Sequence, residues 1–453
     1  MTPAAPPLGL DRRSGRDATP GGGATIASAG TPLEAEDAAR LHMSARNNPM
    51  LITVVLALDR AIAHEVVESR LESRLARYPR FRQRVLEPRL GLGRPRWAPD
   101  PTFDVRHHVH RIDATLVPGS PSLEELTSDL ASIPLAHHHP LWRAHLIDGS
   151  EPALVLIVHH ALADGAALLA LLGELVDDGP AERPPTPSSA PRTLRSRARH
   201  IAAGAIAASR LALARPDPQT PLRGRLGVEK ELAFSSALEL DALRAAARSL
   251  DTTVTGVLLA AVAGACRAQA CAGGHDERLV LHALVPIDVR RGASGGLGNR
   301  YGSVLVPLPI GAHDLAARVD RVRDAARALR SRGAGVSGAR LAEAAGSVSA
   351  FVERLGVELF SRRASVTVSS VKGPARELRL CGAAVRDIMV WAPTAGSIGL
   401  GVTLMSYAGR ARLGVVVGAR AIGSARRVVE ELEIELARIR AFASSTAAYT
   451  AKR

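Results

Sequence analysis

Short runs of β-branched and aliphatic residues alternate along the chain with longer stretches that have helical spacing. The run Leu51–Leu58 is dense in β-branched residues, which predicts a buried strand. Apolar residues then recur at helical spacing over residues 63–77. Further strands are expected at 105–112, 142–147 and 153–158. After residue 165, leucines recur every three to four positions up to Val176, which predicts a helix that Asp177-Asp178-Gly179-Pro180 ends.

The second half of the chain repeats this mixed pattern. A buried helix is expected over 253–270, opened by Thr253 or Thr255, and two more helices over 315–329 and 425–442. The expected strands are 279–285, 303–308, 365–371, 400–406 and 411–417. The chain therefore divides into two α/β halves of similar size.

Composition places the boundaries between these parts. Residues 1–35 are rich in Pro, Gly, Ala and Thr, which predicts a disordered tail, and residues 36–180 form the first domain. Residues 181–226 form a linker, because they hold two proline clusters and lack acidic residues from Arg183 to Arg215. Within it, residues 193–214 are expected to form a basic helix. Residues 227–453 form the second domain.

The net charge of +14 comes almost entirely from arginine, because the chain of 453 residues has only three lysines. This charge is spread along the chain without aromatic-interleaved basic modules, so we expect no nucleic-acid partner. Anionic lipid or the phosphates of coenzyme A suit the same sign of charge. Three cysteines (Cys266, Cys271 and Cys381) are too few for a disulfide framework and indicate a reducing cytoplasm. A transmembrane helix and a secretory signal are not expected, since no apolar run reaches ~20 residues.

The strongest chemical pattern is His159-His160-x-x-x-Asp164-Gly165, placed directly after the expected strand 153–158. An imidazole at a strand end is held by the backbone and still faces a cavity, and its neutral form is a suitable general base near pH 7. Asp164 is expected to shape the turn through an ion pair or as a helix N-cap. Gly165 is expected to allow close backbone approach. The alternative is that both histidines only fill the end of a strand.

Two other patterns predict neither a metal nor a cofactor. His107, His108 and His110, together with residues 137–139, lack accompanying cysteine or carboxylate ligands, and neighbouring histidines in a strand alternate faces. Gly333-x-Gly335-x-x-Gly338 has the spacing of a dinucleotide-binding loop but follows an arginine-rich helix rather than a strand.

The histidine motif is similar to that of the coenzyme A-dependent acyltransferase superfamily, which includes chloramphenicol acetyltransferase and condensation domains. The fuller resemblance is to the bacterial wax ester synthase/diacylglycerol O-acyltransferase family. It extends from about residue 33 to about residue 440. The resembling segments are Asn47-Asn48-Pro49-Met50, Tyr78 to Val85, Pro140 to Gly149, Val254 to Arg267, Gly298 to Pro309, Val371-Lys372-Gly373-Pro374 and Ser406-Tyr407-Ala408-Gly409.

This resemblance implies two chloramphenicol-acetyltransferase-like domains, each a mixed sheet flanked by helices, with a tunnel between them and His160 at its middle. His159 and Asp164 would complete the catalytic motif. Asn299 would make a polar contact near the reacting centre, or else be a turn residue after Gly298. Gly373 and Pro374 belong to a motif in which the family usually has Asn and Pro where this chain has Ser370 and Lys372, and these departures bear on the acceptor pocket.

The function expected from the resemblance is transfer of a long-chain acyl group from acyl-CoA to a lipid alcohol, giving triacylglycerol or wax ester. Acylation of another hydroxyl or an amine, as in secondary metabolism, and a catalytically silent lipid-binding protein are the alternatives. The linker helix is either a contact to an anionic membrane or lipid-body surface or a solvated tether, which sedimentation with anionic liposomes would distinguish.

Overall fold

The computed structural model describes residues 30–88, 93–179, 216–270, 276–288, 298–299, 301–331, 361–394, 396–419 and 422–451. The linker helix predicted over 193–214, the Gly333 loop and Cys271 lie outside these residues. The described chain begins earlier than the predicted boundary at residue 36. Thr31–Pro32 already form strand β1, which pairs with β4, and the Arg96 side chain bonds the carbonyl of Gly30.

The first half of the chain is built on a six-stranded mixed sheet in the order β13-β14-β2-β7-β6-β5. Its strands are β13 (Leu378–Leu380), β14 (Ala383–Trp391), β2 (Leu51–Leu58), β7 (Ala153–His159), β6 (Trp142–Asp148) and β5 (Val109–Asp113). Its helices are α1 (Ala35–His42), α2 (His64–Arg74), α3 (Leu123–Ser132) and α4 (Gly165–Leu175), with 3-10 turns η1 (Pro79–Arg82) and η3 (Val105–His107). A small sheet of β1, β4 (Arg96–Pro99) and β3 (Gln83–Leu86) lies beside it.

Strand β2 is buried on both faces because helices cover both sides of this sheet. Its even-numbered residues, such as Val54 and Leu56, pack into the cluster that includes α2 and α4. Leu51 and Val55 point the other way, toward α3. Alternation along a strand therefore explains the unbroken apolar run seen in the sequence.

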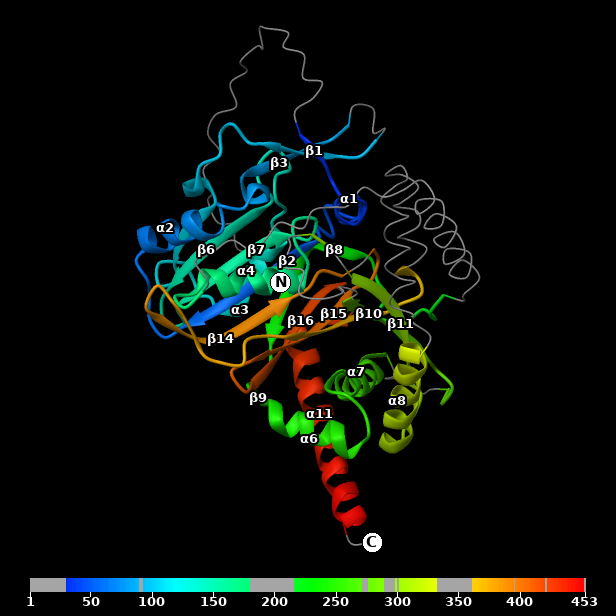
Figure 1. The fold of residues 1–453 in the computed structure, drawn as a ribbon. Coiled ribbons are helices and arrows are strands. Elements are labelled where there is room, and N and C mark those ends of the chain that lie inside the picture. The colour runs from blue at the N-terminus through cyan, green and yellow to red at the C-terminus, as the bar shows by residue number, and fades with distance from the viewer. Residues whose placement is uncertain are drawn as a thin grey trace.

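The second half is built on a seven-stranded sheet in the order β11-β10-β12-β15-β16-β8, with β9 also pairing with β16. The strands are β11 (Tyr301–Leu308), β10 (Leu281–Asp288), β12 (Val366–Lys372), β15 (Leu400–Tyr407), β16 (Arg410–Ala419), β8 (Leu226–Phe234) and β9 (Leu238–Glu239). The helices are α6 (Leu240–Ser249), α7 (Val254–Ala270), α8 (Leu315–Ser331) and α11 (Ala425–Ala451), which gather on one side of the sheet (Figure 1).

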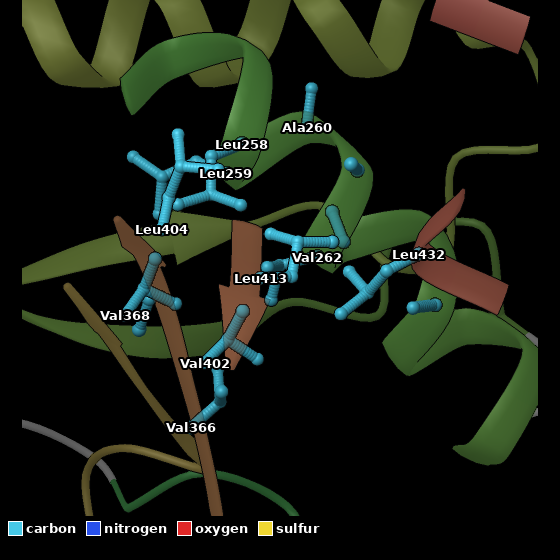
Figure 2. Packing of buried hydrophobic residues seen from close by; sticks show 14 of the residues in the cluster. Leu258, Leu259, Ala260, Val262, Val366, Val368, Val402, Leu404, Leu413 and Leu432 are labelled. Carbon is cyan, nitrogen blue, oxygen red and sulfur yellow. The ribbon is translucent and has the colours of Figure 1, made fainter. Parts of the chain in front are cut away.

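Helix α7 forms the centre of the second core. Leu258 and Val262 lie over the sheet residues Val368 and Leu413, and Leu432 of α11 closes the cluster (Figure 2). The helix opens as predicted at Thr253, whose Oγ1 accepts a hydrogen bond from the amide of Gly256 at 3.1 Å. Among the described helices, none is by itself long and apolar enough to span a membrane. Helices α6 and α7 reach that length only as a pair bent by 90°.

Two features differ from the sequence prediction. The strand expected over 105–112 begins only at Val109, because Asp104 accepts a hydrogen bond from the amide of Arg106 and starts the 3-10 turn η3. Strands β13 and β14 come from the second half of the sequence but pair in the first sheet, where β14 lies against β2. Figure 1 shows β14 in orange among the strands of the first sheet.

Candidate active site

Strand β7 delivers His159 and His160 to opposite sides of its end. His159 pairs with Leu51 and shares the parity of Ile157, so its ring lies on the α3 side of the sheet. His160 follows the last strand residue, and its amide donates to the carbonyl of Met50 at 2.8 Å. Met50 adopts a left-handed conformation with φ 52°, which turns the chain into β2 at this point.

His159 shapes the turn that follows the strand. Its Nδ1 accepts a hydrogen bond from the amide of Ala161 at 3.0 Å, and its carbonyl accepts one from Leu162 at 2.9 Å. Burial lowers the pKa of His159 to about 3, and the neighbouring His137 and His160 act in the same direction. The ring is neutral, only 1% exposed, and its Nδ1 lone pair is engaged, so it is poorly placed to accept a substrate proton.

The backbone of His160 is held from the second half of the chain. Asn299 donates from Nδ2 to the carbonyl of His160 at 2.7 Å. Its amide and Nδ2 each also donate to Oδ1 of Asp37 at 2.9 Å. Asp37 is fully buried in α1 and forms an ion pair with Arg80 at 2.8 Å. Both halves therefore fix the position of His160.

The loops around this contact approach each other closely. Ala163 forms an isolated parallel bridge with Gly298, whose φ is 112°. A Cβ at Gly298 would lie 3.2 Å from Arg80 Nη1 and 3.4 Å from the Asp37 carboxylate oxygens. The positive φ favours glycine here, and a Cβ would also crowd the Arg80–Asp37 ion pair.

The ring of His160 faces Tyr301 at the start of β11. The Tyr301 hydroxyl lies 3.2 Å from Nε2, and it accepts a hydrogen bond from Arg40 Nε at 2.8 Å. Because the hydroxyl accepts a hydrogen bond from Arg40, its own O–H is available to donate to Nε2, and in that arrangement the imidazole proton is on Nδ1. That nitrogen has no partner of hydrogen-bond geometry among the described residues, although the residue's own carbonyl acts on it electrostatically.

Burial lowers the pKa of His160 to about 4, and the charge of Arg40 acts in the same direction. The residue's own carbonyl, Asp164 and Asn299 act in the opposite direction and favour the protonated ring. His160 is therefore neutral at pH 7 with 8% of its surface exposed, and groups that stabilise an imidazolium are already in place.

Asp164 is the N-cap of helix α4. Its Oδ1 accepts a hydrogen bond from the amide of Ala167 at 2.9 Å, so of the two contacts expected from the sequence the N-cap is present. The expectation that Gly165 permits a close backbone approach stays a prediction. Apart from its chain neighbours and its own helix, no atom of the described residues lies within 4 Å of where its Cβ would be.

Gly373 and Pro374 contact the end of β15 rather than His160. The amide of Gly373 donates to the carbonyl of Ser406 at 3.0 Å, and the carbonyl of Pro374 accepts from Ala408 at 2.9 Å. A Cβ at Gly373 would collide with the Ser406 carbonyl and with Met405. These residues bring two strand ends together, and the side chain of Lys372 next to them is exposed.

A pocket between the two halves borders the same region. It is lined by the residues before β2, by the loop after β14, and by Lys230, Leu232 and Val416 of the second sheet. Met50 lines this pocket and also accepts the amide of His160. Among the residues that the structure describes, no group of three or more histidine, cysteine or acidic side chains has the arrangement of a metal site.

Sequence reasoning missed Asp37, Arg40 and Tyr301. Asp37 and Arg40 lie in one short helix and are 0% and 7% exposed. Charged residues are rarely buried without a partner, but nothing in the local sequence shows that this helix is buried. Tyr301 lies two residues after Asn299, within the segment Gly298 to Pro309 that resembles the acyltransferase family. Its place next to a candidate site residue was the only sequence signal for Tyr301.

Comparison with known proteins agrees with this architecture. Residues 33–202 match the family model for the wax ester synthase/diacylglycerol acyltransferase catalytic domain, and residues 297–440 match the model for the C-terminal domain of the same proteins. The chain belongs to this family of acyltransferases.

Relatives in Mycobacterium tuberculosis match along most of the chain. A putative diacylglycerol O-acyltransferase is 30% identical over 405 residues, which cover 78% of this chain and 83% of the relative. A probable diacylglycerol O-acyltransferase is 28% identical over 439 residues, or 90% of this chain and 93% of the relative.

Solved structures show the same fold. The wax ester synthase/diacylglycerol acyltransferase from Marinobacter aquaeolei VT8 matches with a TM-score of 0.66 at 21% identity, covering 91% of this chain and 100% of that one. The first condensation domain of the calcium-dependent antibiotic synthetase matches with a TM-score of 0.65 at 16% identity, covering 93% and 98%. The family acyltransferase therefore has the chloramphenicol-acetyltransferase-like architecture of two sheet-containing halves flanked by helices.

Proposed function

We propose that the protein is an acyl-CoA-dependent O-acyltransferase that transfers a long-chain acyl group to a lipid alcohol, either diacylglycerol or a fatty alcohol. The observation that carries this proposal is the neutral, tightly positioned imidazole of His160, whose Nε2 lone pair faces Tyr301. The family and the names of its mycobacterial members support the acyl transfer and the choice of acceptor.

In the proposed reaction, Nε2 of His160 removes the proton of the acceptor hydroxyl as its oxygen attacks the thioester carbonyl. The new C–O bond forms, the carbonyl oxygen takes the π-electron pair, and collapse of this intermediate breaks the C–S bond. The thiolate of coenzyme A then takes the proton from the His160 imidazolium. Base and both substrates meet directly, so the route uses no acyl-enzyme and calls for no metal or prosthetic group.

Residues from both halves of the chain support the protonated form of His160. Asn299 fixes the His160 backbone, and Asp164 favours the charged ring, so the base gains its proton without reorganisation of its surroundings. In this proposal His159 and Asp164 position the turn, and Gly373 and Pro374 hold the strand ends near it.

The test is acyl-CoA consumption by the full chain with dioleoylglycerol, with hexadecanol, with a long-chain amine, and with no acceptor. We expect acceptor-dependent release of coenzyme A with one or both alcohols, and a loss of at least ~10³-fold in His160→Ala, which removes the base. His138→Ala, which removes an exposed histidine, is the matched control and should retain full activity. Undiminished turnover in His160→Ala would refute the proposal, and turnover with the amine alone would change the acceptor class.

A further inference from the structure

Arg40 is a buried cation beside the proposed base. Its side chain is 7% exposed, and among the described residues no carboxylate oxygen lies within ion-pair distance of its guanidinium. Its recorded partners are the hydroxyl of Tyr301 at 2.8 Å and the sulfur of Met43 at 3.8 Å. Burying a charge without a counter-ion is costly, so a cation in this position is suited to a negative charge that arises during the reaction.

Tyr301 connects this cation to the reacting centre. The Arg40 guanidinium carbon lies 4.7 Å from the centroid of the Tyr301 ring, and the His160 ring centroid lies 5.5 Å from it. The phenol is thus held between the cation and the imidazole, and its hydroxyl is fixed 3.2 Å from Nε2. Tyr301 comes from β11 and the other two residues from the first half, so the three meet only in the folded protein.

The neutral imidazole has one lone pair at Nε2, and in this structure the Tyr301 hydroxyl is directed at it. An acceptor alcohol that gives its proton to Nε2 must take the place of this hydroxyl. The Tyr301 O–H then loses Nε2 as its acceptor but remains bound to Arg40 beside the proposed base. A displaced donor in a buried site needs a new acceptor.

We propose that the new acceptor is the thioester carbonyl oxygen, and that Tyr301, polarised by Arg40, is the oxyanion donor of the acyl transfer. This inference rests on the proposed function. As the acceptor oxygen bonds to the thioester carbon, the carbonyl π-electrons move to oxygen, and the Tyr301 O–H donates to the resulting anion. The Tyr301 proton is not transferred. When the C–S bond breaks, the electron pair returns to the carbonyl, and the proton held by His160 goes to the thiolate.

The surroundings suit a donor rather than a second base. Burial raises the pKa of Tyr301, although Arg40 opposes this shift, so the hydroxyl keeps its proton at neutral pH. The positive charge of Arg40 strengthens the O–H as a donor and compensates the developing anion.

The experiment compares steady-state kinetics of the wild type, Tyr301→Phe, Arg40→Met and the double variant, with acyl-CoA and the best alcohol. Tyr301→Phe keeps the ring and removes only the donor. We expect kcat to fall about 10²–10³-fold with little change in KM for acyl-CoA, because the lost bond strengthens only in the transition state. Arg40→Met should lower kcat at least ~10-fold in the wild type and much less in the Tyr301→Phe background, because Arg40 acts through the hydroxyl.

Tyr78→Phe is the matched control, because it removes another buried hydroxyl, one bonded to Glu174 away from His160, and it should keep wild-type kcat. If Tyr301→Phe folds poorly, the kcat of Arg40→Met decides. A Tyr301→Phe kcat equal to or above that of the wild type would overturn the inference and show that the hydroxyl only blocks Nε2. Loss of turnover in His160→Ala alongside that result would leave the proposed function standing, whereas undiminished turnover in His160→Ala would remove both.

Discussion

In the proposed reaction, the pKa of His160 sets the acid limit of activity. Burial is the largest cause of its lowering to about 4, and Arg40 is the next. The base must be neutral to accept a proton, so the active fraction falls as pH drops through this pKa. The surrounding charged or titratable groups are Arg40, Asp164, Tyr301 and the neutral His159, and of these Asp164 favours the protonated ring.

We therefore expect kcat/KM to be level from about pH 6 to pH 8 and to decline only as pH approaches 4. Arg40→Met removes a cation that disfavours the imidazolium, so the pKa of His160 rises and the acid limb moves to higher pH. The measurement is kcat/KM against pH, over the range in which circular dichroism shows a folded protein. A wild-type acid limb near 6.5, the value of an unperturbed imidazole, would contradict this account.

At the residue scale, the sequence predicted the groups that form a local motif and missed those joined by the fold. His160 and Asp164 are close along the chain, and their spacing indicated a base and a helix cap. Asn299 came from a resemblance, and the structure places it on the His160 carbonyl. Arg40 and Tyr301 are 261 residues apart, so no local pattern could pair them.

Helix α4 depends on its N-cap. Asp164→Ala removes the acceptor for the amide of Ala167 and should cost about 1 kcal/mol of the free energy of unfolding. Asp164→Asn keeps an acceptor oxygen of similar reach and should retain most of that stability, losing only the favourable charge at the helix start. Urea denaturation of both variants gives the comparison. Equal destabilisation by the two substitutions would mean that the carboxylate charge, and not the cap, is what matters.

At the scale of elements, the sequence predicted strands correctly where the apolar run was continuous and missed β14, whose run is interrupted by charged residues. Strands β2 and β7 are continuous aliphatic runs, and the sequence placed both. Strand β14 was missed because Arg386 and Asp387 interrupt its apolar residues. In the fold a β-bulge between Val385 and Asp387 accommodates this pair, and Asp387 forms an ion pair with Arg412 at 2.5 Å. Such a partner in another strand is invisible to periodicity.

At the scale of the whole molecule, β14 belongs to the second half of the sequence but completes the sheet of the first half. We therefore expect the two halves to unfold as one cooperative unit. Residues 1–226 alone lack β14, which leaves the edge of β2 unpaired along a buried apolar strand. We expect this fragment to aggregate or to lack cooperative unfolding, and to become soluble when residues 227–453 are co-expressed. The full chain should unfold in one transition seen alike by tryptophan fluorescence and circular dichroism. Independent folding of the first fragment would show that β14 is dispensable.

The whole architecture was predicted as two α/β halves, but the sequence could not show that a strand crosses between them. Consecutive strands usually pair in one sheet, and β14 pairs with β13, but the two lie in a different sheet from β12 and β15 on either side of them in the sequence. Their place in the first sheet comes from the pairing of β14 with β2.

The position of β14 also has a consequence for synthesis on the ribosome. Strand β7 is complete at residue 159, whereas β14 ends at residue 391. At translation speeds of about 5–20 residues per second, the nascent sheet waits roughly 10–50 seconds for its missing neighbour. During that interval the unpaired edge of β2, a strand of mostly aliphatic residues, can pair with other chains. Chaperones that shield this edge should therefore raise the yield of native protein.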